Sequence, residues 1–188
     1  MRIGIDIDDT ITNTYDDTIR TICNLYNQDY NELISKQMNY DNLLIHFPKA
    51  FSKEIYEKEI KKVKLKTNAK KIINKLSKNN EIFIITARNK NECSLPYNMS
   101  YNYLTDNKIK FDKLFVEVLD KGKCCYENKI DLFIDDSVKN CQSVIEYGID
   151  TILFDNIFNK NGDIKRFDNW IDIYEYVERN YNGKNNNK

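Results

Sequence analysis

The chain has 188 residues, enough for one domain with a sizeable core, or for a core domain with one insertion. Its 29 basic and 29 acidic residues cancel, so it lacks the strong positive field expected of a general nucleic-acid-binding protein. A small anionic ligand bound at a local cationic site is still compatible with this balance.

The cysteines and the apolar runs bear on the compartment. The spacing of the five cysteines fits neither a disulfide framework nor a zinc site, so we expect reduced, structural thiols. No apolar stretch approaches the roughly 20 residues that span a bilayer, and the N-terminus enters a strand without a signal-peptide layout. We therefore expect a cytoplasmic protein with no membrane partner.

The first predicted strand is the apolar run from Arg2 to Ile7, and two carboxylates, Asp6 and Asp8, lie at its end. In a strand these side chains would share one face, and burying the pair without a counter-charge would be costly. The segment Asp6 to Thr10 therefore indicates either a metal site or an ordinary acidic turn, since Asp also favours turns.

About 74 residues separate the first predicted strand from the next, far more than a crossover between parallel strands needs. A structureless loop of that length is rare in a compact domain, so an inserted subdomain is expected. Apolar residues from Tyr15 to Tyr26 recur at helical spacing, which predicts a helix there. We place a small helical cap at residues 15–66. The single histidine, His46, has apolar neighbours that predict a packed cap residue.

Four more short runs read as buried parallel strands, and a helix from about Asn68 to Lys78 precedes them. They span residues 81–85, 113–118, 131–134 and 151–154. Strand-like runs separated by polar or helical stretches predict an α/β fold with a Rossmann-like parallel sheet. Its core would comprise residues 1–14 and 67–181, followed by a disordered tail at residues 182–188.

Polar residues follow several of these strands. Thr86 and Arg88 come after the second strand, Asp135 and Asp136 after the fourth, and Lys121 lies between the third and the fourth. The carboxyl ends of strands form the ligand crevice of open α/β sheets, so these groups could converge on one site.

These motifs, in this order, resemble those of the haloacid dehalogenase superfamily of aspartate-nucleophile phosphohydrolases. Within that superfamily the chain is similar to the 5'(3')-deoxyribonucleotidase group and its bacterial relatives. The finer resemblance rests on four segments and three single residues: Arg2 to Thr12, Ile84 to Arg88, Asp131 to Cys141, Leu153 to Asn156, Asn159, Arg166 and Trp170.

The resemblance implies catalytic roles for four residues. Asp6 would attack phosphorus and form an aspartyl-phosphate, and Asp8 would serve as acid and then as base. Thr86 would hydrogen-bond a phosphoryl oxygen, although it could instead cap a helix over Asn89 to Glu92. Lys121 would neutralise negative charge, with Lys123 as the alternative lysine.

The resemblance also implies phosphate contacts and a metal. The phosphate would be bound by Asp9, Thr10, Ala87 and Arg88, although Arg88 could simply pair with a carboxylate. Asp9 occupies a position where many relatives carry glycine, and Asp tolerates a positive φ better than most residues.

Mg²⁺ would be held by Asp6, Asp8 and the pair Asp135 and Asp136, because it prefers hard oxygen ligands. Which residue of the pair binds directly and which through water is open.

The chain is therefore expected to be a Mg²⁺-dependent phosphatase, most plausibly a 5'-nucleotidase acting on nucleoside or deoxynucleoside monophosphates. The alternatives are a phosphatase of sugar phosphates or another small metabolite, and a non-catalytic metal- or nucleotide-binding relative. The expected partner is a small phosphorylated substrate and no polynucleotide. The oligomeric state is open, with a homodimer as one alternative.

Overall fold

The computed structural model describes residues 1–160 and 163–182. In this part of the chain a six-stranded sheet has the order β3-β2-β1-β4-β5-β6, and every neighbouring pair is parallel. The strands are β1 (Arg2–Ile5), β2 (Glu81–Ile85), β3 (Lys113–Phe115), β4 (Leu132–Asp135), β5 (Asp150–Phe154) and β6 (Arg166–Phe167). The predicted Rossmann-like α/β fold is confirmed. Of the predicted tail, residues 183–188 lie outside the described residues.

Two predicted strands end earlier than expected, two others differ from the expected bounds by one residue, and one strand was missed. The first strand ends at Ile5 rather than Ile7, because the chain turns so that the N–H groups of Ile11 and Thr12 donate to the Ile7 carbonyl. The third ends at Phe115 rather than Val118, ahead of a left-handed residue, Glu117. The two-residue strand β6 was missed, since so short a segment carries no apolar run.

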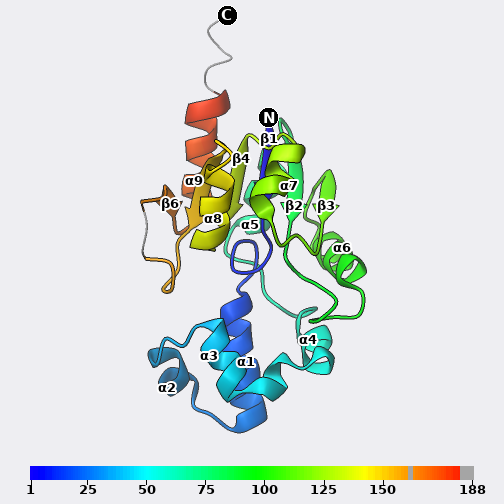
Figure 1. Cartoon of the computed structure of the whole chain (residues 1–188), viewed down its shortest axis with the longest axis vertical. Coiled ribbons are helices and arrows are strands. Elements are labelled where there is room, and N and C mark those ends of the chain that lie inside the picture. Colours follow the sequence, from blue (N-terminus) through cyan, green and yellow to red (C-terminus); the bar gives the residue numbers. More distant parts are fainter. Residues whose placement is uncertain (161–162, 183–188) are drawn as a thin grey trace, which may run out of the picture.

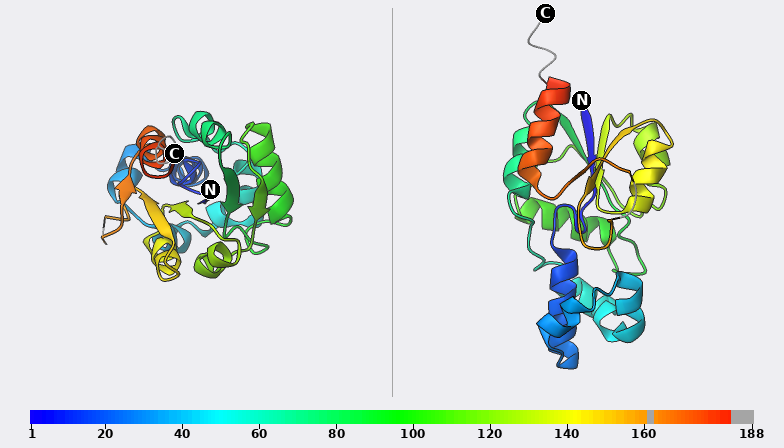
Figure 2. Two further views of the ribbon diagram at one scale, coloured as in Figure 1. Left: turned by 90° about the horizontal axis from the view of Figure 1, so that it is seen from above. Right: turned by 90° about the vertical axis from the view of Figure 1, so that its left-hand side faces the viewer.

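Helices cover both faces of the sheet (Figure 2). On one face α5 (Ala69–Leu76), α6 (Pro96–Asp106) and α9 (Trp170–Val177) pack against alternate strand residues such as Ile82 and Ile84. On the other face α7 (Lys121–Glu127) and α8 (Val138–Ile145) pack against Phe83 and Phe133. Because successive strand side chains point to opposite faces, each buried strand needs apolar residues at consecutive positions.

The four α-helices that directly follow β1 lie beyond the carboxyl ends of the strands (Figure 1). They are α1 (Thr14–Tyr26), α2 (Tyr30–Ser35), α3 (Tyr40–His46) and α4 (Lys53–Glu59), with a 3₁₀ turn at Pro48–Phe51. The apolar side chains of α1, α2, α3 and the 3₁₀ turn form a separate cluster that includes Ile19, Leu33 and Leu43. The predicted packing of His46 is wrong: α3 buries Leu43 and leaves His46 exposed.

Two chain segments connect these helices to the sheet and run side by side. Thr12 and Leu65 form an isolated antiparallel bridge, and the N–H of Asn13 donates to the carbonyl of Lys64 at 2.8 Å. The domain limits at 14/15 and 66/67, which stay predictions, fall beside this bridge. Among the described residues, no helix has the length and apolar character needed to cross a bilayer.

Candidate active site

Three carboxylates meet at the carboxyl ends of β1 and β4. The parallel register pairs Ile5 with Ile134, and the N–H of Asp6 donates to the carbonyl of Ile134 at 2.9 Å. Asp6 therefore leaves β1 level with Asp135. One oxygen from each of Asp6, Asp135 and Asp136 lies within 4.8 Å of the others. The two strand ends thus form a compact carboxylate cluster, which is defined here as Asp6, Asp135 and Asp136.

Lys121, the first residue of α7, projects into this cluster. Its Nζ lies 2.6 Å from Asp6 Oδ1 and 2.6 Å from Asp135 Oδ2, and the residue is 3% exposed. Burial alone would lower the pKa of Lys121, but the two carboxylates more than offset it and hold that pKa above its usual value. Of the two lysines left open by the sequence, the structure brings Lys121 to the cluster. Lys123 is exposed and lies 3.9 Å from Glu127.

Gly122 explains why α7 can carry a lysine to this point. A Cβ at Gly122 would collide with the backbone carbonyl of Ser143 in α8. Only glycine lets the two helices approach so closely, and Asp120 caps α7 by accepting the Lys123 N–H at 3.0 Å. The short segment Asp120 to Gly122 therefore fixes where the ammonium group lies.

Asp135 and Asp136 are oriented by amide side chains. Asn140 Nδ2 donates to both carboxylate oxygens of Asp135 at 3.2 Å, and Asn156 Nδ2 donates to Asp136 Oδ2 at 3.1 Å. Asn159 donates to the Asp136 carbonyl at 2.8 Å. The sequence analysis named Asn156 and Asn159 only as part of a resemblance. It missed the role of Asn140, which lies one helical turn after the serine cap of α8.

The electrostatics of the cluster fit a divalent cation. Burial, followed by repulsion from Asp135 and Asp8, raises the pKa of Asp6 to about 7 despite the neighbouring Lys121. Burial, followed by repulsion from Asp135, Asp9 and Asp6, raises the pKa of Asp136 well above its usual value. Hard carboxylate oxygens at this spacing are ligands that Mg²⁺ accepts, and its charge would favour their ionised forms. The residues present therefore fit a Mg²⁺ site.

A pH dependence of stability follows for the metal-free protein. The ordinary pKa of the Asp6 carboxyl is 3.8, and in the folded chain it is about 7, so between these values the folded state binds more protons. The free energy of unfolding in chelator should therefore fall as pH rises from about 4 to about 7. Urea denaturation of wild type and Asp6→Asn should show the variant gaining relative stability across this window. A constant difference between the two proteins would contradict the assigned shift.

Asp8, predicted as the acid and base, is held by Arg88. The guanidinium donates to both carboxylate oxygens of Asp8 at 2.8 Å, and the Thr14 hydroxyl donates to one of them at 2.7 Å. Burial alone would raise the pKa of Asp8, but the charge and hydrogen bonds of Arg88, with Thr14, hold it below its usual value. Arg88 is 3% exposed. Of the two roles left open for Arg88, the structure shows the pairing with a carboxylate.

Arg88→Met should therefore both destabilise the protein and slow turnover. It leaves Asp8 with Thr14 alone, and the expected loss is about 2 kcal/mol, less than for a fully buried pair because the Asp8 side chain is 31% exposed. Urea denaturation measures the loss. The matched control is Arg20→Met, which removes the exposed pair with Asp16 at the same 2.8 Å and should cost under about 1 kcal/mol. Equal losses would contradict a special role for Arg88.

The turn after β1 is anchored from two directions. Asp9 has a φ of 53°, which lies in the left-handed region that Asp tolerates better than most residues. Its carboxylate accepts from the Tyr15 N–H at 2.9 Å and from the Tyr40 hydroxyl at 2.7 Å, so it points at the cap helices. Thr10 is fully buried, and its carbonyl accepts from the Trp170 indole at 3.1 Å. The phosphate contacts predicted for Asp9 and Thr10 stay predictions.

Thr86 and Ala87 lie at the end of β2. Thr86 is 1% exposed, and its hydroxyl accepts from the Arg88 N–H at 3.3 Å. The alternative role as a helix cap is wrong, because the segment from Asn89 to Glu92 forms a turn and not a helix. Ala87 is half-buried. The register that pairs Ile5 with Ile84 places both residues at the same edge of the sheet as Asp6.

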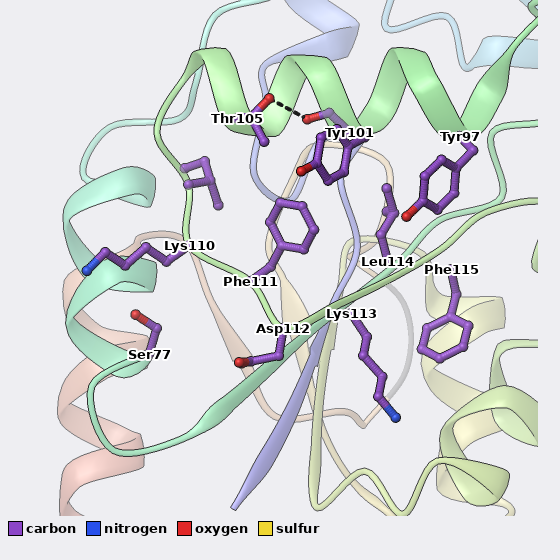
Figure 3. A pocket seen from close by; sticks show the side chains of 11 residues that line it. Ser77, Tyr97, Tyr101, Thr105, Lys110, Phe111, Asp112, Lys113, Leu114 and Phe115 are labelled. Atoms are coloured by element: carbon purple, nitrogen blue, oxygen red, sulfur yellow. Dashed lines mark hydrogen bonds between the residues drawn. The ribbon is translucent and has the colours of Figure 1, made fainter.

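Two cavities differ in their relation to this cluster. One of about 610 Å³ is lined by Asp9 and Asp136 and by residues of α1 and α3. The other, of about 770 Å³, runs along the edge strand β3 beneath α6, where Tyr97, Tyr101 and Phe111 line it (Figure 3). None of the predicted site residues lines the second cavity.

Two solved structures with the same fold are described as hydrolases. YfnB of Bacillus subtilis, described as a haloacid dehalogenase-type hydrolase bound to magnesium, matches with a TM-score of 0.64 and 16% identity over 94% of this chain and 97% of that one. A haloacid dehalogenase-superfamily hydrolase of Geobacter sulfurreducens matches with a TM-score of 0.63 and 12% identity over 94% and 95% of the two chains. A search with protein-family models found no match.

With this fold and its sequence similarity, the chain belongs to the haloacid dehalogenase superfamily of hydrolases. The relative that shows this in sequence is a protein of Clostridium acetobutylicum that is named as a nucleotidase. It is 33% identical over 187 residues, which cover 95% of this chain and 94% of the relative. The predicted resemblance is confirmed at this level, and so is the expectation of a hydrolase-type enzyme.

Proposed function

We propose that the protein is a Mg²⁺-dependent phosphatase that hydrolyses nucleoside or deoxynucleoside monophosphates, a 5'-nucleotidase. The observation that carries the phosphatase assignment is the buried bridge from Asp6 through Lys121 to Asp135, with Nζ to oxygen distances of 2.6 Å. A buried carboxylate held beside an ammonium group and a candidate metal site is suited to attack an anionic ester. The similarity to a protein named as a nucleotidase supports the substrate class.

Asp6 is the proposed nucleophile. One of its carboxylate oxygens forms a bond to phosphorus while the bond from phosphorus to the ester oxygen breaks, which leaves an aspartyl-phosphate. Water then attacks that phosphorus and restores the Asp6 carboxylate. Two displacements replace one difficult hydrolysis. Lys121 stabilises the negative charge that the phosphoryl oxygens carry in both steps, and Thr86 donates a hydrogen bond to one of them.

Asp8 is the proposed proton carrier. It would protonate the departing ester oxygen and later take a proton from the attacking water. Oδ1 of Asp8 accepts from both Arg88 and Thr14, whereas Oδ2 accepts from Arg88 alone, so Oδ2 keeps a lone pair on which a proton can be carried. Thr14, which also bonds Asp8, is the first residue of α1 and so links the proton carrier to the cap helices.

The metal would be held by the side chains of Asp6, Asp135 and Asp136 and by the Asp8 backbone carbonyl. When bound, Mg²⁺ would supply positive charge that offsets the repulsion between the nucleophile and the anionic substrate. A cytoplasmic location is part of the same proposal and agrees with five cysteines that are free in the structure.

Release of inorganic phosphate from a panel of substrates tests the proposal. The panel contains nucleoside and deoxynucleoside 5'- and 3'-monophosphates, sugar phosphates and phosphoglycolate, each with Mg²⁺ and with a chelator. We expect Mg²⁺-dependent release that favours 5'-monophosphates. A preference for sugar phosphates would refute the substrate class and keep the phosphatase, whereas no release from any substrate would refute both.

A further inference from the structure

The cavity of about 610 Å³ adjoins the carboxylate cluster. Asp136 belongs to both, and Asp9 lines the cavity from the turn that follows the proposed nucleophile. Its volume lies within the range of about 300–1,000 Å³ that is usual for small-ligand sites. The remaining walls come from α1, α2 and α3, from the start of α8, from Lys66 and from the loop after β5. A ligand in this cavity would therefore contact both the cap helices and the sheet.

Aromatic rings form one side of this cavity. The Tyr15 ring lies 4.7 Å from that of Phe158 and 5.7 Å from that of Tyr40, measured between centroids, in edge-on arrangements. Tyr15 is 9% exposed, whereas Tyr40 and Phe158 are 36% and 37% exposed. Tyr15 is thus the packed base of the group, and Tyr40 and Phe158 keep surface available for a ligand.

The position of the Tyr40 ring is fixed by the site itself. Its hydroxyl donates to Asp9 at 2.7 Å, and the same carboxylate accepts from the Tyr15 N–H at 2.9 Å. Asp9 therefore ties two aromatic residues of the cap helices to the turn that carries Asp6 and Asp8. A glycine at this position would make neither bond, so this anchor depends on the side chain that this chain carries there.

Charge around the cavity narrows the chemistry of the ligand. Asp9, Asp16 and Asp136 line it together with Lys66 and Lys139, so acids outnumber bases among the described lining residues. Asp136 is a proposed Mg²⁺ ligand, and the other lining acids and bases balance, so no surplus cation is there to bind a second phosphate or a carboxylate, whereas a flat, uncharged ring would meet aromatic faces and amide groups. Asn13, Asn39 and Asn156 supply those amides.

We propose that this cavity receives the base of the nucleotide substrate, and that Tyr40, held by Asp9, and Phe158 determine specificity by packing against the base. The inference rests on the proposed function and adds which residues contact the base of the leaving nucleoside. A cavity of this kind makes the protein selective for phosphomonoesters with a planar, uncharged group over those with a second anionic group.

The test compares two substrates that differ only by the base, a nucleoside 5'-monophosphate and ribose 5-phosphate. The variants are Tyr40→Leu and Phe158→Leu, both at positions more than one third exposed. Each should lower the ratio of kcat/KM for the nucleotide to kcat/KM for ribose 5-phosphate about tenfold, the loss expected for one aromatic contact with a base. Tyr40→Phe, which keeps the ring and loses the bond to Asp9, should lower it less.

Tyr97→Leu is the matched control, because Tyr97 is an exposed tyrosine that lines the other cavity (Figure 3). Its ratio should equal that of wild type. Equal losses on both substrates in Tyr40→Leu and Phe158→Leu, or no loss on either, would overturn the base site and leave the nucleotidase in place. If wild type with Mg²⁺ releases phosphate from neither substrate, the proposed function fails and the base site falls with it.

Discussion

Asp6→Asn should lower phosphate release by roughly four orders of magnitude or more, because the amide cannot form the aspartyl-phosphate. The fold should persist, since Lys121 keeps its contact with Asp135 at 2.6 Å. In chelator near pH 8 the variant should be at least as stable as wild type, because it removes a buried carboxylate whose pKa is raised. Steady-state phosphate release and urea denaturation measure the two effects.

Asp41→Asn, a change of the same kind at an exposed position of α3, is the matched control and should keep full activity. Retention by Asp6→Asn of more than about one hundredth of wild-type activity would rule out Asp6 as the nucleophile. A large loss of stability in that variant would show instead that Asp6 is mainly a structural partner of Lys121.

Lys121→Met should remove activity and also destabilise the protein. The change leaves the Asp6 and Asp135 carboxylates facing each other without the ammonium group that contacts both. Removing one member of a buried ion pair typically costs about 3–5 kcal/mol, because the remaining charge is left uncompensated. Urea denaturation in chelator should show a loss of that size, and added Mg²⁺ should restore part of it by binding the two carboxylates that have lost the ammonium group.

Lys123→Met is the control for this change, since Lys123 lies two residues away on the same helix and its side chain is 62% exposed. Its stability should differ from that of wild type by less than about 0.5 kcal/mol, and its activity should be unchanged. A similar loss in both variants would mean that α7 is sensitive to any substitution. The specific role of Lys121 would then be contradicted.

The sequence was sufficient to predict which residues meet at the carboxylate cluster. Asp6, Asp135 and Lys121 follow or lie between buried strands, and the carboxyl ends of parallel strands share one edge of a sheet. Residue type and strand order therefore placed them, even though Lys121 and Asp6 are 115 positions apart. The choice between Lys121 and Lys123 needed the structure. Both follow the Asp120 cap, and they differ only in the direction in which their side chains leave the first turn of α7.

Contacts that depend on side-chain direction were not predictable. Nothing local to Arg88 shows that its guanidinium reaches Asp8 across 80 positions. The anchor from Asp9 to Tyr40 joins two subregions whose relative placement does not follow from local sequence patterns. The exposure of His46 has the same origin. Its apolar neighbours indicated burial, but α3 packs with Leu43 inward, and Leu44 and Ile45 remain exposed.

The most direct test of the account is the rate of phosphate release from a nucleoside 5'-monophosphate by the wild-type protein, measured with Mg²⁺ and again with excess chelator. The account predicts steady release with Mg²⁺, loss of nearly all release in chelator and recovery when Mg²⁺ is restored. Release that continues unchanged in chelator, or no release with Mg²⁺, would contradict it.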